Sequence, residues 1–267
     1  MLPQLRAFTL AVALENGRAP LILWPRNSDG SPNISSLRRL TLSSPSAEDE
    51  IFDHLPSELQ ELSLRDVPRF YERSRYPNPF AHLDHAYSPR ILSCTETLAI
   101  FRTLHCCAAL RHLELVVTED ESELQLLAYV AASCPGLEFF ELHCYRNVSE
   151  YSDLLNAPLA ISLDALGRAL SAFRALRVAR LNIDLPWSQF TISRYASRET
   201  RDGVTYSGTI AQIIAHAVPW LESVCVLTCG RSGVHQWRIW DVHDREGTIE
   251  LESVEATGLD RRRLSDR

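Results

Sequence analysis

A short leucine phrase recurs along the chain and restricts the folds open to it. The phrase is an apolar residue, two variable residues, a second apolar residue, one variable residue and a third apolar residue. Its copies begin at Leu5, Leu37, Leu59, Leu110, Leu137, Leu176 and Leu221. Successive strand side chains point to opposite faces, so the last three positions predict a strand with one apolar face. The first leucine is expected to enter the core just before that strand.

Amphipathic segments between the later phrases predict helices. Ser93 and Glu96 have capping-box spacing, Asp120 and Glu123 mark a second helix start, and Pro219 ends the last apolar stripe. The expected inward residues are Leu98, Phe101 and Leu104, then Leu124, Leu127, Val130 and Ala131, then Leu163, Leu166, Leu170 and Phe173, and finally Ile210, Ile213, Ile214 and Ala217. Helices between successive strands predict parallel pairing, with the units stacked into a solenoid.

The spacing of the phrases is uneven. First leucines lie between 22 residues (Leu37 to Leu59) and 51 residues (Leu59 to Leu110) apart. Regular repeats of this kind run about 20–29 residues, so we expect an irregular arc. The longest interval holds a Pro-rich loop from Pro68 to Pro89 and a degenerate strand. A second excursion, Pro186 to Ser207, contains Asp202-Gly203 as a hairpin-turn candidate.

The C-terminal part changes pattern. Apolar residues alternate over Gln236–Val242 and again over Thr248–Val254, with a turn at Asp244–Gly247 between them. We expect an antiparallel hairpin, at about residues 235–255, that caps the end of the stack. Residues 1–258 are therefore predicted to form a single domain, and residues 259–267 a flexible tail.

Composition narrows the class of protein. The net charge of -7 is spread along the chain, which argues against a nucleic-acid surface. No apolar run reaches the roughly 20 residues of a membrane span, and the first residues lack a secretory signal pattern. The seven cysteines have no framework spacing and indicate reduced thiols. We therefore expect a cytoplasmic or nuclear protein.

Candidate reaction and metal sites are weak. Cys225 and Cys229 lack a second ligand pair and are better read as buried thiols. His82 and His85 lie in a long loop without an evident third ligand. No nucleophile elbow, phosphate-binding loop or dinucleotide fingerprint occurs. We expect no catalytic residue, cofactor or metal, and no enzymatic activity.

The variable strand positions are the stronger candidates for a binding surface. In a solenoid they would line one continuous concave sheet. Mixed charge with one exposed aromatic residue suits a protein partner rather than a phosphate backbone. The predicted partner-binding residues are Arg39, Thr41, Glu61, Ser63, Arg65, His112, Glu114, Phe139, Glu141, His143, Arg180 and Asn182.

Together, the phrases at Leu37, Leu110 and Leu137, the capped helices and the closing hairpin form a pattern. With its Trp237-Arg238-Ile239 strand and Glu246-Gly247 turn, this pattern resembles the leucine-rich-repeat region of fungal F-box-type proteins over about Leu2 to Leu259. The resemblance implies an irregular α/β leucine-rich-repeat solenoid with a parallel concave sheet, outer helices and a β-hairpin cap. In that family the repeats bind a partner and an N-terminal F-box recruits a ubiquitin-ligase scaffold.

The expected F-box is not recognisable in the sequence. The first phrase begins at Leu5 and leaves no room ahead of it, and Pro68 interrupts any helix after Leu55-Pro56. We therefore expect a protein-interaction scaffold that contacts the ubiquitin machinery only if an F-box is supplied elsewhere. Two alternatives stay open: an enzyme with a loop-borne site near His82 and His85, and a truncated F-box paralogue with a purely structural role.

Overall fold

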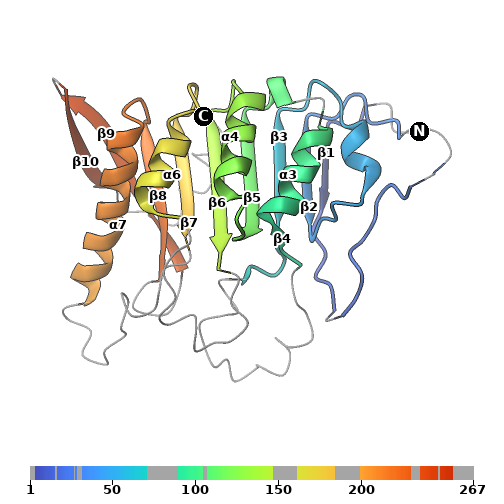
Figure 1. The fold of residues 1–267 in the computed structure, drawn as a ribbon, viewed down its shortest axis with the longest axis horizontal. Helices are drawn as coiled ribbons and strands as arrows, with labels where there is room; N and C mark the ends of the chain where they lie inside the picture. Colours follow the sequence, from blue (N-terminus) through green and yellow to red (C-terminus); the bar gives the residue numbers. More distant parts are fainter. Residues whose placement is uncertain are drawn as a thin grey trace.

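The chain forms one mixed α/β sheet with the strands in nearly sequential order. The computed structural model describes residues 4–15, 17–26, 28, 32–70, 90–104, 107–146, 161–183, 199–229, 235–245 and 247–254. The ten-stranded sheet has the order β1-β2-β3-β5-β6-β7-β8-β9-β10, with β4 beside β5 (Figure 1). Pairing is parallel from β1 to β8 and antiparallel for β8–β9 and β9–β10.

Seven of the ten strands, β1 to β3 and β5 to β8, fall on the leucine phrases. Their bounds are Ala7–Leu10 (β1), Arg39–Ser43 (β2), Glu61–Arg65 (β3), Leu92–Ser93 (β4), His112–Thr118 (β5), Phe139–Tyr145 (β6), Val178–Ile183 (β7), Ser223–Cys229 (β8), His235–Arg245 (β9) and Thr248–Val254 (β10). The expected parallel sheet and C-terminal antiparallel hairpin are confirmed. The short β4 lies in the longest interval between phrases, where a degenerate strand is predicted.

In every phrase from Leu37 onward, the first leucine closes a turn before its strand. The N–H of Leu110 donates to the carbonyl of Cys107, and the N–H of Leu137 donates to that of Cys134. The same three-residue contact is made by Leu37, Leu59, Leu176 and Leu221. All these leucines are buried, so each satisfies its backbone donor while its side chain enters the core.

A second backbone contact repeats where each strand begins. The carbonyl of Arg111 accepts from the N–H groups of both Glu138 and Phe139 on the next strand. Arg6, Arg38, Gln60, Glu138 and Arg177 accept in the same way from their neighbours. One carbonyl therefore holds the entry of the following strand at each step, which fixes the register of the parallel pairs.

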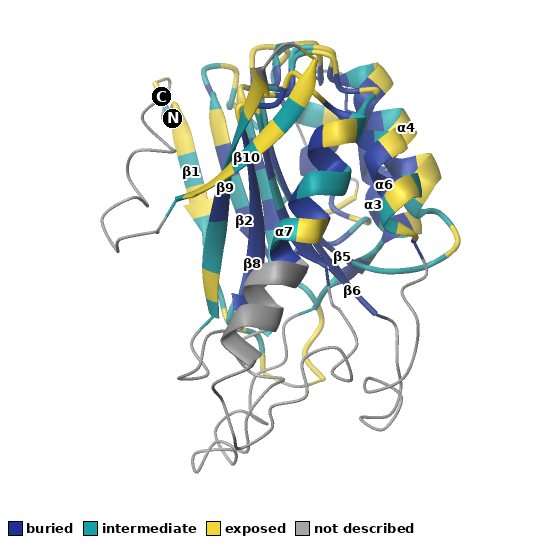
Figure 2. Ribbon diagram, turned by 90° about the vertical axis from the view of Figure 1, so that its left-hand side faces the viewer, coloured by how far each residue is buried: buried dark blue, intermediate teal, exposed yellow. Residues whose placement is uncertain are grey.

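Helices cover one face of the sheet and leave the other without a described helix (Figures 1 and 2). They are α3 (Cys94–Thr103), α4 (Glu123–Ser133), α6 (Leu163–Leu170) and α7 (Glu199–Ala217), with short 3-10 helices at Glu50–His54 and Cys107–Ala109. Ser93 and Glu96 form the predicted capping box at the start of α3, which satisfies N–H groups that have no partner within the helix.

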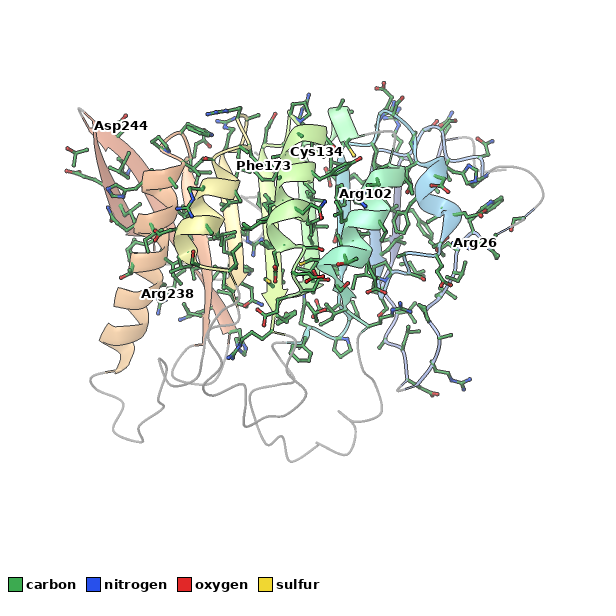
Figure 3. All side chains as sticks on the ribbon, in the orientation of Figure 1. Arg26, Arg102, Cys134, Phe173, Arg238 and Asp244 are labelled. Carbon is green, nitrogen blue, oxygen red and sulfur yellow. The ribbon has the colours of Figure 1, made fainter. Side chains whose placement is uncertain are left out.

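The core lies between this helix layer and the sheet. It combines strand residues such as Leu113 and Phe140 with helix residues such as Phe101 and Val130. Cys134 and Phe173, labelled in Figure 3, lie at the ends of α4 and α6 and are also buried. Phe140 stacks on Phe173 with 5.4 Å between ring centroids, joining the sheet to the helix layer.

Two sequence predictions about this layer are wrong. Leu124 is 47% exposed, and the inward residues of α4 are Leu126, Leu127, Val130 and Ala131. Leu124 lies in the first turn of the helix and at the edge of this buried face. Asp202-Gly203 is not a hairpin turn but lies within α7. The glycine is tolerated there since a long helix absorbs the local cost of about 1 kcal/mol.

Candidate functional site

In-register pairing arranges the helix-free face of the sheet into rows that cross the strands. The first, which we call the amino-edge row, lies near the amino-terminal ends of the parallel strands. Its members are Ala7, Arg39, Glu61, His112, Phe139, Val178, Ser223, Asp241 and Glu252, each a registered partner of the next. The second row runs Thr9, Thr41, Ser63, Glu114, Glu141, Arg180, Cys225 and Ile239.

The strand register places the predicted partner-binding residues in these rows or one step beyond. Arg39 is exposed, whereas Glu141, His143 and Asn182 are buried. Half-buried positions hold Thr41, Glu61, Ser63, Arg65, His112, Glu114, Phe139 and Arg180. Sequence reasoning therefore finds the face, but it does not foresee that part of the face is inaccessible.

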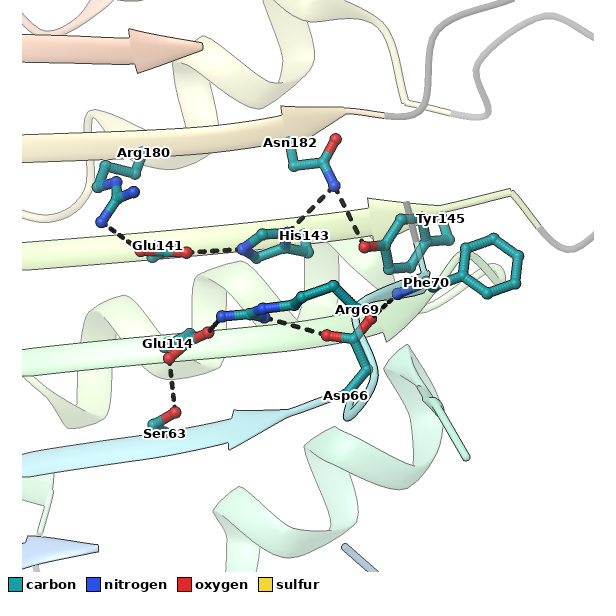
Figure 4. A network of polar contacts seen from close by, with 10 residues as sticks. All are labelled: Ser63, Asp66, Arg69, Phe70, Glu114, Glu141, His143, Tyr145, Arg180 and Asn182. Atoms are coloured by element: carbon teal, nitrogen blue, oxygen red, sulfur yellow. Dashed lines mark hydrogen bonds and ion pairs between the residues drawn. The ribbon is translucent and has the colours of Figure 1, made fainter. Parts of the chain in front are cut away.

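The buried part is organised around Glu141 (Figure 4). One Oε of Glu141 lies 2.9 Å from Nη1 of Arg180, and the other lies 2.7 Å from Nε2 of His143. Burial alone would raise the pKa of Glu141, but the hydrogen bond from His143 and the charge of Arg180 outweigh it and lower the pKa. Glu141 is therefore held as a carboxylate within the sheet.

Asn182 sets the orientation of the His143 ring. Its amide nitrogen lies 3.1 Å from Nδ1 of His143 and 3.3 Å from the hydroxyl oxygen of Tyr145. A donor at Nδ1 leaves the imidazole proton on Nε2, where it is donated to Glu141. The three strand residues therefore form a continuous hydrogen-bonded chain, and Figure 4 shows it running from β6 to β7.

The segment after β3 adds a second charged cluster. Asp66, whose side chain is fully buried, accepts from Nη1 of Arg69 at 3.0 Å and from the N–H of Phe70 at 2.5 Å. Arg69 also pairs with Glu114, and the Ser63 hydroxyl donates to Glu114 at 2.6 Å. The ring of Phe70 meets Tyr145 edge-on at 4.8 Å. Residues 66–70 therefore lie against the helix-free face of β5 and β6 (Figure 4).

An aromatic and guanidinium stack crosses the middle of the face. His112 stacks on Phe139 with ring centroids 5.4 Å apart. Arg180 lies 5.9 Å from the Phe139 centroid and 4.2 Å from that of Trp237 on β9. Arg180 thus combines a carboxylate partner with two aromatic faces, which holds its planar group in place.

Metal binding is the first chemistry that the cluster suggests. Glu114, Glu141 and His143 each offer a ligand atom, and these atoms lie within 4.8 Å of one another. The guanidinium groups of Arg69 and Arg180 already contact the two carboxylates, and they would oppose a cation at this position. We therefore assign no metal to it.

Nucleophilic chemistry also finds little support here. Cys225 lies beside Arg180 in the second row, but burial raises the pKa of its thiol to about 12, so the reactive thiolate is scarce. His82 and His85, on which the loop-borne enzyme alternative depends, lie outside the described residues.

A pocket of about 630 Å³ lies on the opposite side, between α7 and the hairpin. It is lined by Gly208, Thr209, Gln212, Ile213, Trp240, Ile249, Glu250 and Leu251. Among the described residues, this lining has a single carboxylate and no histidine or cysteine, so it does not offer the paired groups that acid–base or nucleophilic catalysis uses.

Sequence reasoning did not select Asp66, Arg69, Phe70, Tyr145 or Trp237. The three-residue spacing of Asp66 and Arg69 is a usable signal for an ion pair. It does not show that Arg69, in the segment after β3, also pairs with Glu114 on β5. Trp237 lies in the predicted hairpin, and only the antiparallel register with β8 places it beside Arg180.

Comparison with protein-family models, curated proteins and solved structures gives no match. Among the described residues, none of the helices is long and apolar enough to cross a membrane.

Proposed function

We propose that the chain is a non-catalytic protein-interaction module whose helix-free sheet face binds a protein partner. One observation carries the proposal: a single row of side chains crosses consecutive strands on a face that no described helix covers. Beside this row, on the same face, the charges of Glu114, Glu141, Arg69 and Arg180 are paired within the chain. Such a surface is rigid before binding, which reduces the entropy lost on association.

We further propose that the architecture is an irregular leucine-rich-repeat solenoid. Support comes from the two backbone contacts that recur at successive phrases, the turn closed by the first leucine and the carbonyl that accepts two N–H groups. In addition, α3 packs on α4, α4 on α6 and α6 on α7, which is the neighbour-to-neighbour packing of solenoid repeats. A role as the substrate-recognition part of an F-box-type ubiquitin-ligase adaptor rests on the sequence resemblance alone.

Differential capture tests the binding face. The wild-type chain and the Arg39→Glu variant would be immobilised and compared for the proteins they retain from an extract of the source cells. Arg102→Glu is the matched control, because Arg102 is exposed on α3 in the helix layer (Figure 3). We expect Arg39→Glu to lose partners that Arg102→Glu keeps, at unchanged melting temperature.

Equal capture by all three proteins would contradict a binding role for this face. Arg180→Glu, although in the predicted set, is a poor probe because it also breaks the internal pair with Glu141. The adaptor role has its own readout: a ubiquitin-ligase scaffold must occur among the captured proteins, and its absence would leave a binding module without that role.

A further inference from the structure

The accessible part of the helix-free face is long and narrow. On β6 only Phe139 is not buried, and every later residue of that strand is. On β7, Val178 and Arg180 are half-buried, and Arg180 is engaged by Glu141 and Trp237. The amino-edge row is thus the strip open to a partner over β5, β6 and β7, and on β8 it continues past the buried Ser223. A strip one row wide fits an extended segment better than the broad surface of a globular domain.

Unequal charge lies at the two ends of this strip. At the β2–β3 end, Arg39 is exposed, whereas Glu61, its registered neighbour in the row, is half-buried. Arg39 forms no ion pair in the part of the chain that the structure describes. At the hairpin end, Asp241 and Glu252 are registered partners. The Glu252 side chain is 75% exposed and lies 3.6 Å from His243. The most exposed charge of the strip is therefore positive at the β2–β3 end and negative at the hairpin end.

The middle of the strip is apolar and aromatic. His112 and Phe139 stack there, with Val178 next in the row. Aromatic residues and arginine are the types that dominate binding energy at protein interfaces. An apolar side chain of a partner would find its contact here, between the two charged ends.

From these observations, we propose that the partner contributes an extended peptide segment that crosses the strands along the amino-edge row, with acidic residues over β2–β3, an apolar residue over Phe139 and basic residues over β9–β10. Seven strand spacings of about 4.8 Å separate Arg39 from Glu252, or about 34 Å, which an extended chain spans with about ten residues. This inference rests on the proposed function and specifies the partner of the same face.

Two labelled decapeptides would test the inference on the full chain. The first carries three glutamates at one end, phenylalanine and leucine flanked by glycines in the middle, and three lysines at the other end. The second has the same composition with its charges alternating. Fluorescence polarisation at low salt should show the first peptide binding at least about fivefold tighter, since only it can meet both charged ends.

Single and double charge reversals separate polarity from general attraction. Arg39→Glu alone and Glu252→Lys alone should each weaken binding of the first peptide about fivefold. The combined variant should recover it, because a free peptide can rotate and present its ends in the opposite order. If a charge reversal impairs folding, the neutral double variant Arg39→Gln with Glu252→Gln takes the place of the charge-reversed variants. This neutral variant should bind the two peptides equally.

Equal affinity for the two peptides, or a combined variant no better than the single ones, would overturn the proposed polarity. Failure of the binding function itself looks different. If capture of cellular proteins is indifferent to Arg39→Glu, the face is not used at all. If capture depends on Arg39 while the peptides do not discriminate, the face is used but by a partner of another shape.

Discussion

Arg180 and Glu141 show how a charged pair is maintained inside the sheet. Their side chains are only 20% and 9% exposed, so both lose most of their hydration on folding. Removing charges from water costs several kcal/mol per ion unless partners replace the water. Here His143 supplies a hydrogen bond to Glu141, and Trp237 lies over the guanidinium. Burial of the Arg180–Glu141 pair therefore depends on His143 and Trp237 as well as on the two charges.

Arg180→Ala is expected to destabilise the protein by about 3 kcal/mol, because it leaves the Glu141 carboxylate buried without its cation. Urea denaturation measures the change. Arg102→Ala, on the exposed side of α3, serves as the control and should stay within about 0.5 kcal/mol of the wild type. A similar small loss for Arg180→Ala would mean that solvent reaches Glu141 and replaces its partner.

Acid should weaken the fold partly through Glu141. The pKa of this carboxyl is lowered in the folded chain, and an unfolded glutamate titrates near about 4.3. A pKa lowered by folding gives stability that is present above the unfolded pKa and lost as the pH falls through the folded one. The free energy of unfolding, measured from about pH 5 to pH 3, should fall more steeply for the wild type than for Glu141→Gln. Parallel curves would assign the acid sensitivity to other carboxyl groups.

Helix starts can be compared directly because α3, α4 and α6 all have a serine at the N-cap, and those of α3 and α4 differ in the bond they make. Ser93 accepts from the N–H of Glu96 and completes a capping box, whereas Ser122 makes no side-chain cap bond to α4. Ser93→Ala should cost about 1 kcal/mol, while Ser122→Ala loses only an exposed contact with Thr95. Chemical denaturation of both variants provides the measurement, and equal losses would show that the capping bond contributes nothing.

At the level of elements, the sequence predicts those features that depend only on residues close together in the chain. The leucine phrases and the Ser93 box are local, so strand positions and the start of α3 follow from them. Gly167 illustrates what does not: a Cβ there would lie 2.9 Å from that of Ala217 on α7. This close approach of α6 and α7 depends on residues 50 positions apart in the sequence (217 minus 167). The position of Arg69 against Glu114 is unpredictable for the same reason.

On the scale of the whole molecule, sequence reasoning identifies which residues share one face of the sheet but not how deeply each of them is buried. Strand alternation places Arg39, Glu114 and Asn182 on one side, and the register of the sheet brings them onto the same face. Their burial differs because it depends on what packs over each position. Residues 66–70 contact the second row, while Trp237 enters from a strand paired in the opposite direction. Non-local packing therefore restricts the proposed binding surface to the amino-edge row.

The strands should also differ in local stability according to their place in the sheet. Strands β5, β6 and β7 each pair on both sides and are largely buried. β1 and β10 each pair on one side within the described sheet, and their residues alternate between exposed and half-buried. Fewer buried contacts lower the free energy of local opening.

Native-state hydrogen exchange should show amides of β6 opening only with global unfolding, and those of β1 and β10 exchanging at least about tenfold faster. Adding urea should reduce protection in β6 with the full denaturant dependence and leave that of the edge strands almost unchanged. Uniform protection across all strands would instead mean that the sheet opens as one cooperative unit.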